Sequence, residues 1–245
     1  MKKVIIFFCV LFLLQACGLG EECIERTGAM TMQEFSVDPF SKIIIFEGIS
    51  AEISQGDTYK VVVKTGANLM GKISVITKDG QLQVKDKTEC NWTRPYGQTT
   101  VYITAPNLEE INCKTSLKIK SNGVLTYPTL RLFSMDLTQG AGTGDFEMQL
   151  DNQQTIIESN NISSFYLSGK SKELHANFYY GNGKFKGNSL ICDTIHVFHR
   201  GTNDMEVYPL YKIQGNIYST GNILLKNTPP IIQVNELYRG KLLYD

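Results

Sequence analysis

The chain has 245 residues, of which 42% are hydrophobic and 20% are charged, a composition typical of an ordinary globular protein. Lysine and arginine together number 24, and so do aspartate and glutamate, so the formal net charge is zero. A chain without a basic surplus lacks the electrostatic footprint of nucleic-acid-binding proteins, which argues against nucleic acid as a partner.

The first sixteen residues are typical of an export signal. Two lysines precede an apolar run of 11 residues, Val4 to Leu14, which is too short to span a bilayer as a stable helix. The following Leu14-Gln15-Ala16-Cys17 places a small residue before a cysteine and resembles the lipobox of bacterial lipoproteins. The resemblance implies that residues 1–16 are a signal peptide and that Cys17 carries acyl chains, palmitate among them, which anchor the protein to a membrane.

The segment after this cysteine is predicted to be a tether. Residues 17–36 are mixed, small and polar, without a sustained period. Glu21 and Glu22 resemble the surface-export signals of Bacteroidetes lipoproteins, and a plain solvated tether is the alternative reading of the same residues. The predicted localisation is therefore the outer membrane, with a lipid anchor, on its periplasmic or its cell-surface side.

From Phe40 onward the pattern is that of strands. Apolar and polar residues alternate, β-branched residues are frequent, and no window shows a convincing helical period. Asp79-Gly80 between two alternating runs is a typical hairpin turn. The candidate strands in this half are Ile43–Phe46, Ala51–Ile53, Tyr59–Lys64, Ile73–Thr77, Gln81–Lys85 and Val101–Ile103.

A long repeat dominates the second half. Apolar residues recur at Phe146, Phe165, Phe185, Met205 and Ile223, at intervals of 19, 20, 20 and 18 residues. Strands repeating with such a period are typical of a solenoid, in which each turn buries its apolar face by stacking on its neighbours. We therefore predict an all-β fold, a right-handed parallel β-helix or β-solenoid of short strands, with antiparallel-like N-terminal strands capping it.

Several short segments also occur in a specific order and spacing. They are Phe40–Ile43, Ile53–Asp57, Val61–Val63, Asn68–Leu69, Lys78–Val84, Val101–Ile111, Thr220–Lys226, Pro229–Ile232 and Gly240–Leu242. Together they resemble the DUF2807 family, also called putative autotransporter adhesin, head GIN domain proteins. The resemblance covers residues 37–245 and implies one β-solenoid domain, usually on lipoproteins or surface proteins of Bacteroidetes. It implies no activity.

Four cysteines remain in the segment beyond Cys17, and they would face an oxidising compartment. Cys23 and Cys90 both lie in polar, non-repetitive segments, where a disulfide has something to hold, so this pairing is favoured. The alternative is that all four thiols are free. Cys113 and Cys192 lie in strand-like sequence and are expected to be buried fillers.

A metal centre is not predicted. Cys192, His196 and His199 are ligands by type, but two histidines three residues apart point to opposite faces of a strand. A fourth ligand is not evident, and no cofactor is expected.

Glycines at positions 140, 142 and 144 invite comparison with a phosphate-binding loop. Such a loop requires a helix directly after it, and strand-like Phe146–Leu150 follows instead. These glycines are therefore predicted to form a turn of the solenoid, where a tight corner requires a positive φ.

No catalytic pattern is visible in the sequence. It has no Asp-Asp or Asp-x-Asp, Glu109-Glu110 falls in a turn-like segment, and nothing resembles a serine or cysteine triad. The protein is predicted not to be an enzyme.

The remaining functional candidates are aromatic. Tyr179, Tyr180, Tyr208 and Tyr211 occur in clusters, and alternate residues of a strand must face outward. Outward tyrosines on a long flat face suit a glycan or protein surface ligand, whereas core and cross-strand packing is the alternative. We therefore expect a cell-envelope lipoprotein with a non-enzymatic, adhesin-like binding domain. The alternatives are a structural envelope spacer and a glycan-active β-helix enzyme.

Overall fold

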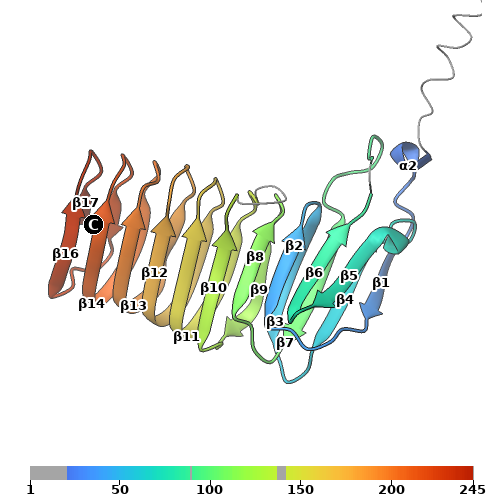
Figure 1. Ribbon diagram of the computed structural model, residues 1–245, viewed down its shortest axis with the longest axis horizontal. Coiled ribbons are helices and arrows are strands. Elements are labelled where there is room, and N and C mark those ends of the chain that lie inside the picture. The colour runs from blue at the N-terminus through green and yellow to red at the C-terminus, as the bar shows by residue number, and fades with distance from the viewer. Residues whose placement is uncertain (1–20, 89, 137–141, 245) are drawn as a thin grey trace, which may run out of the picture.

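A computed structural model describes residues 21–88, 90–136 and 142–244, with side chains from residue 23 onward. The predicted signal peptide and Cys17 lie outside the described residues, as does Gly140. The described chain is an all-β solenoid, in which strands stack side by side along one long axis (Figure 1). The predicted fold class is confirmed.

Two parallel ladders run along the solenoid. The first contains, in spatial order, β7 (Thr99–Ala105), β3 (Ile49–Gln55), β9 (Ile119–Leu125), the N-terminal parts of β11 (Phe146–Ser159), β12 (Phe165–Phe178), β13 (Phe185–His199) and β14 (Met205–Ile217), then β15 (Ile223–Leu225) and β17 (Leu242–Tyr244). The second contains β6 (Gln81–Asp86), β2 (Lys42–Phe46), β8 (Glu110–Lys114), β10 (Thr129–Ser134), the C-terminal parts of β11 to β14, and β16 (Ile231–Glu236).

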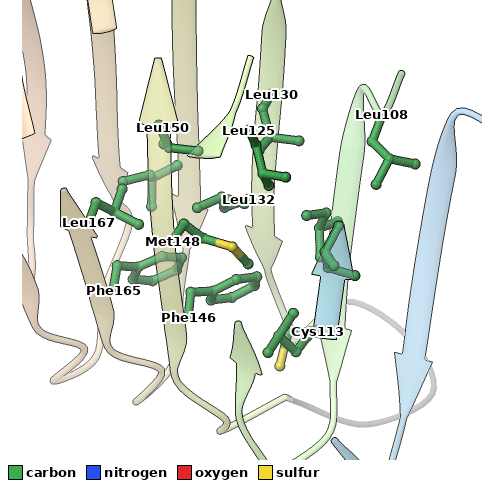
Figure 2. Packing of buried hydrophobic residues seen from close by; sticks show 14 of the residues in the cluster. Leu108, Cys113, Leu125, Leu130, Leu132, Phe146, Met148, Leu150, Phe165 and Leu167 are labelled. Atoms are coloured by element: carbon green, nitrogen blue, oxygen red, sulfur yellow. The ribbon is translucent and has the colours of Figure 1, made fainter. Parts of the chain in front are cut away.

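The buried side chains fill the space between the ladders. Phe146, Phe165, Phe185, Met205 and Ile223 are cross-strand partners in one continuous register, and all are buried. They are the apolar positions whose spacing predicts the solenoid. Figure 2 shows the rings of Phe146 and Phe165 with Met148 and Leu167, all in this interior. The repeat in sequence is therefore a column of core residues in space.

Antiparallel strands cover the N-terminal end, as expected. β4 (Lys60–Gly66) pairs antiparallel with β7, β1 (Met30–Phe35) pairs antiparallel with β4, and β5 (Ile73–Lys78) pairs antiparallel with β6. Because these strands occupy the end of each ladder, they block edge-to-edge pairing there. β1 lies within residues 17–36, so the predicted tether is too long: residues 30–35 belong to the fold.

Helices are minor elements of the described chain. They are α2 (Glu21–Ile24) and the 3-10 turn η1 (Met70–Lys72). No helix among the described residues has the length and apolar character needed to cross a membrane.

Gly142 and Gly144 lie in the connection that leads into β11, and the structure gives a different reason for them from the expected one. A Cβ on Gly142 would lie 2.0 Å from the carbonyl oxygen of Cys113, and a Cβ on Gly144 would lie 2.0 Å from that of Leu117. Neither glycine has a positive φ. The absence of a side chain lets this segment pass directly over the β8–β9 connection, so close approach explains both glycines.

Candidate functional site

The outward side chains of the second ladder form a regular grid over β12, β13, β14 and β16. Alternate residues of these strands face outward, and neighbouring strands are in register, so outward residues line up along the solenoid axis. We call this grid the polar face. Its members are Glu173, His175 and Asn177, Thr194, His196 and Phe198, Lys212, Gln214 and Asn216, and Ile231, Gln233 and Asn235.

Side chains of the polar face bond to one another between turns. Nε2 of Gln214 lies 2.8 Å from Nδ1 of His196, and Nδ2 of Asn235 donates to Oδ1 of Asn216 at 2.9 Å. Such cross-strand bonds reduce the rotamer freedom that a ligand would otherwise have to freeze. The polar face is thus partly organised before anything binds.

A shallow groove of about 340 Å³ crosses the polar face. Its lining residues are Asn177, His196, Val197, Phe198, Gln214, Gly215, Asn216, Gln233 and Asn235. Gly215 contributes to its floor with φ +135°, and a Cβ there would lie 1.9 Å from the carbonyl oxygen of Val197. Only glycine fits this close approach, so the groove depends on it.

Three aromatic rings form a column at one end of the polar face. The centroids of Tyr179 and Phe198 are 5.5 Å apart, and those of Phe198 and Tyr218 are 4.8 Å apart. The hydroxyl of Tyr179 donates to Oε1 of Glu158 at 3.0 Å, which fixes that ring. Tyr218 is 39% exposed, so the column offers an apolar ring surface beside the polar groove.

The four tyrosines singled out in the sequence do not form one patch. Tyr180 and Tyr211 are exposed, whereas Tyr179 and Tyr208 are half-buried. Tyr208 and Tyr211 lie just before the part of β14 that enters the second ladder, and Tyr179 and Tyr180 lie just after the corresponding part of β12. The two pairs therefore occupy opposite ends of the polar face.

Sequence reasoning missed Phe198 and Tyr218 as partners of Tyr179. The signal was available, because the three residues are 19 and 20 positions apart, which is one turn of the solenoid. Residues one turn apart are neighbours in space, however far apart they are in sequence.

The structure does not bring Cys192, His196 and His199 together as ligands of one metal ion. His196 faces outward, whereas Cys192 and His199 are buried, so the three do not converge. Burial raises the pKa of Cys192 to about 12 and lowers the pKa of His199 to about 4, so both are neutral at pH 7. His196 instead stacks on His175 of the preceding turn, with centroids 4.4 Å apart and 4° between the planes.

A disulfide joins Cys23 to Cys90, with the two Cα atoms 4.6 Å apart. The amide of Trp92 also donates to the carbonyl of Cys23 at 3.0 Å, and the Arg94 guanidinium donates to the carbonyl of Glu25 at 2.7 Å. These contacts fasten the loop between β6 and β7 to the N-terminal segment. Cys113 is free and buried, and burial raises the pKa of its thiol to about 11.

Glu109 and Glu110 do not form a carboxylate pair for catalysis. Glu109 is exposed, whereas Glu110 accepts a hydrogen bond from Nη1 of Arg131 at 2.9 Å. The same guanidinium contacts Glu158 on the next turn. One arginine therefore bridges two acids, which is an ion-pair network of the second ladder.

The DUF2807 family, described as putative auto-transporter adhesin, head GIN domain, matches residues 39–229. The chain belongs to this family. Solved structures with a similar fold are also known.

A putative adhesin from Bacteroides fragilis NCTC 9343 superposes with a TM-score of 0.79 at 20% identity, over 89% of this chain and 97% of that one. A putative adhesin from Parabacteroides distasonis ATCC 8503 has a TM-score of 0.63 at 17% identity, over 89% and 98%. A putative lipid binding protein from the same organism has a TM-score of 0.61 at 14% identity, over 88% and 97%. Among curated proteins, no match was found. At these identities the similarity establishes the fold.

Proposed function

We propose that this DUF2807 protein is a lipid-anchored envelope protein whose polar face binds an extended surface polymer, either a glycan or a protein segment, without altering it. The groove across the polar face, flanked by the column of Tyr179, Phe198 and Tyr218, is the observation that carries the proposal. Adhesin-like binding is also what membership of the family suggests.

The shape of the polar face favours an extended ligand. Its outward residues repeat from turn to turn over four strands, so a long polymer can meet the same kinds of groups several times. Individually weak contacts then add up, because each contact after the first is intramolecular. A groove of about 340 Å³ that opens onto a flat face gives little enclosure for a small molecule.

The chemistry of the groove suits hydroxyl and amide groups. Asparagine and glutamine side chains at Asn177, Gln214, Asn216, Gln233 and Asn235 offer both donors and acceptors. The adjacent rings can pack against the apolar side of a sugar or of a peptide side chain. Such a mixture of amides and aromatic rings favours binding over a plain spacer role, for which a uniformly polar exterior would suffice.

A glycan-active enzyme is the alternative within the same fold. That reaction needs an acid and a second carboxylate on opposite sides of the bond to be cleaved. Among the described residues that line the groove, none is a carboxylate. Binding without turnover is therefore the better match.

The proposed location follows from the N-terminus together with the family. The lipobox-like Leu14–Cys17 supports acylation of Cys17, and the segment that follows would hold the solenoid close to the outer membrane. Family membership supports the cell surface or envelope as the setting. Which side of the outer membrane the domain faces depends on export of the anchored protein.

The experiment is to present the full chain to an array of glycans and extracellular-matrix proteins. We expect reproducible binding to a small set of polymers, with no product accumulating during prolonged incubation. A Tyr218→Ser variant, which removes the exposed ring of the column, should bind more weakly with little change in melting temperature. Accumulation of cleaved polysaccharide would replace the binding proposal with the enzyme alternative.

A further inference from the structure

We propose that Glu173, His175 and His196 form a binding site for a divalent transition-metal ion of the zinc type. Their three ligating atoms lie within 4.8 Å of one another. The inference goes beyond the function proposed above, since binding of a polymer in the groove does not require a metal.

The solenoid brings the three residues together by its register. His175 on β12 and His196 on β13 are direct cross-strand partners, and Glu173 precedes His175 by two residues on the same face. The two imidazole rings stack in parallel, and both Nε2 atoms lie beside the same carboxylate oxygen. Oε1 of Glu173 lies 3.0 Å from Nε2 of His175 and 2.9 Å from Nε2 of His196.

These distances are close to those of a metal coordination shell. Zinc binds imidazole nitrogen and carboxylate oxygen at about 2.0–2.2 Å, so neighbouring ligand atoms of a tetrahedral site lie about 3.3 Å apart. Because an imidazole binds a metal in its own plane, the two parallel rings would have to tilt toward each other, and the Glu173 carboxylate would have to move outward, for an ion to lie between the three atoms. Two imidazoles with one carboxylate suit zinc, copper, nickel or iron, whereas magnesium and calcium prefer oxygen ligands throughout.

Neighbouring amides hold the ligands in place. Nε2 of Gln214 lies 2.8 Å from Nδ1 of His196, and Nε2 of Gln154 lies 3.3 Å from Oε2 of Glu173. When Nε2 of His196 binds a metal, its Nδ1 carries the proton and needs an acceptor. Rotation of the Gln214 amide supplies its Oε1 for that purpose, as outer groups commonly do for metal-bound histidines.

The surroundings of His196 favour the form of its ring that binds metals. Burial, and after it the neighbouring His175, lowers the pKa of His196, while Glu173 acts in the opposite direction. A lowered pKa favours the neutral form of the ring, which is the form that binds metals. Lys212, two strands from Glu173, adds a positive charge on this side and opposes the metal weakly.

The site is open to solvent. The side chains of Glu173, His175 and His196 are 39%, 30% and 30% exposed. An ion can enter from solution, and with three protein ligands it retains a coordination position for water. His196 also lines the groove, so this position faces the surface proposed to bind a ligand.

The test is Zn²⁺ binding by the full chain, purified through a tag that contains no histidine and stripped with a chelator. Competition against a chromogenic chelator should show one Zn²⁺ per chain. His175→Gln, His196→Gln and Glu173→Gln should each weaken Zn²⁺ binding by about 100-fold or more, because each removes a ligand. Asn177→Ala, on the same face of β12, is the matched control and should bind as the wild type does.

Co²⁺ gives a second, spectroscopic readout. The wild type should show the visible absorption of cobalt bound by nitrogen and oxygen ligands, and the histidine variants should lose it. Circular dichroism in the absence of metal verifies that each variant is folded. If a histidine variant does not fold, the test rests on Glu173→Gln, which preserves the shape of the side chain. The proposal is overturned if the wild type takes up no stoichiometric Zn²⁺, or if folded ligand variants bind Zn²⁺ as tightly as the wild type.

Discussion

The rings of Phe146 and Phe165 stack face to face, with centroids 4.8 Å apart and 6° between their planes. The separation equals the distance between neighbouring strands of a sheet, because the two residues are cross-strand partners on consecutive turns. An interval of 19 residues in the sequence thus becomes one strand spacing in the structure. The same register continues through Phe185 and Met205, so each turn depends on the next for its core.

Phe185→Ala should therefore lower the free energy of unfolding by about 3–5 kcal/mol, as removal of a buried aromatic ring usually does. Phe185 is fully buried, whereas the adjacent Lys184 is exposed. Lys184→Ala is the matched control and should change the free energy by less than about 0.5 kcal/mol. Urea denaturation of both variants measures the difference, and equal, small effects would contradict a core position for Phe185.

The solenoid was predictable from the sequence because its core residues repeat. The strand order at its N-terminal end was not. β2 and β3 come first among the parallel strands, yet they lie between β6–β7 and β8–β9 in space. Hydrophobic spacing identifies strands, but it carries no information on which strand pairs with which across a long connection. The sequence pattern does not indicate β1 as a strand, because most of its residues are exposed and lack the alternation of a buried strand.

Gly215→Ala should destabilise the fold around the groove by about 2 kcal/mol or more. Its φ of +135° is a conformation essentially confined to glycine, and the added Cβ would meet the Val197 carbonyl oxygen. Gly71→Ala is the control, because a Cβ there has no atom within 4 Å and φ is not positive. Thermal unfolding compares the two, and equal melting temperatures would show that the close approach at Gly215 does not occur.

The candidate site was less predictable than the core. Outward positions carry no hydrophobic signal, so the sequence indicates Tyr179, Tyr180, Tyr208 and Tyr211 only through their residue type and clustering. The sequence period, applied to other residues as well, would have placed Tyr179 and Phe198, 19 residues apart, on neighbouring turns. It would not have paired His175 with His196, because an irregularity in the β12–β13 register makes their separation 21 residues. What it would not have given is the groove, which depends on the backbone approach at Gly215.

His199 should make the protein sensitive to acid. Burial lowers its pKa from 6.5 to about 4, so the unfolded chain takes up a proton at a higher pH than the folded one. The stability contributed by the neutral ring is complete above about pH 6.5 and is lost as the pH falls toward 4, a change of up to about 3 kcal/mol. Asp204, the nearby carboxylate, reduces the effect.

His199→Leu should remove this part of the acid sensitivity, because leucine does not titrate. The measurement is the difference in unfolding free energy between pH 7 and pH 4.5 for the variant and the wild type. Carboxylates titrate in both proteins and cancel in the comparison. An identical loss in the two proteins would mean that His199 is not the group responsible.

Cys17→Ser should release the protein from the membrane, if the lipobox-like sequence is processed as proposed. The hydroxyl cannot take the place of the acylated thiol, and each buried methylene of an acyl chain contributes about 0.8 kcal/mol to anchoring. Metabolic labelling with a palmitate analogue and membrane fractionation measure the effect. Unchanged labelling would contradict the proposal that Cys17 is acylated.

The central claim, that the groove of the polar face binds a surface polymer, is tested most directly by two matched substitutions. Asn216→Trp places a bulky side chain in the groove, whereas Asn188→Trp places the same side chain on an exposed part of β13 outside it. On a polymer identified by the array, we predict that Asn216→Trp weakens binding by about 10-fold or more, as loss of a central contact does. Asn188→Trp should bind as the wild type does, and both variants should keep its melting temperature. Equal affinity of all three proteins for the polymer would contradict the claim.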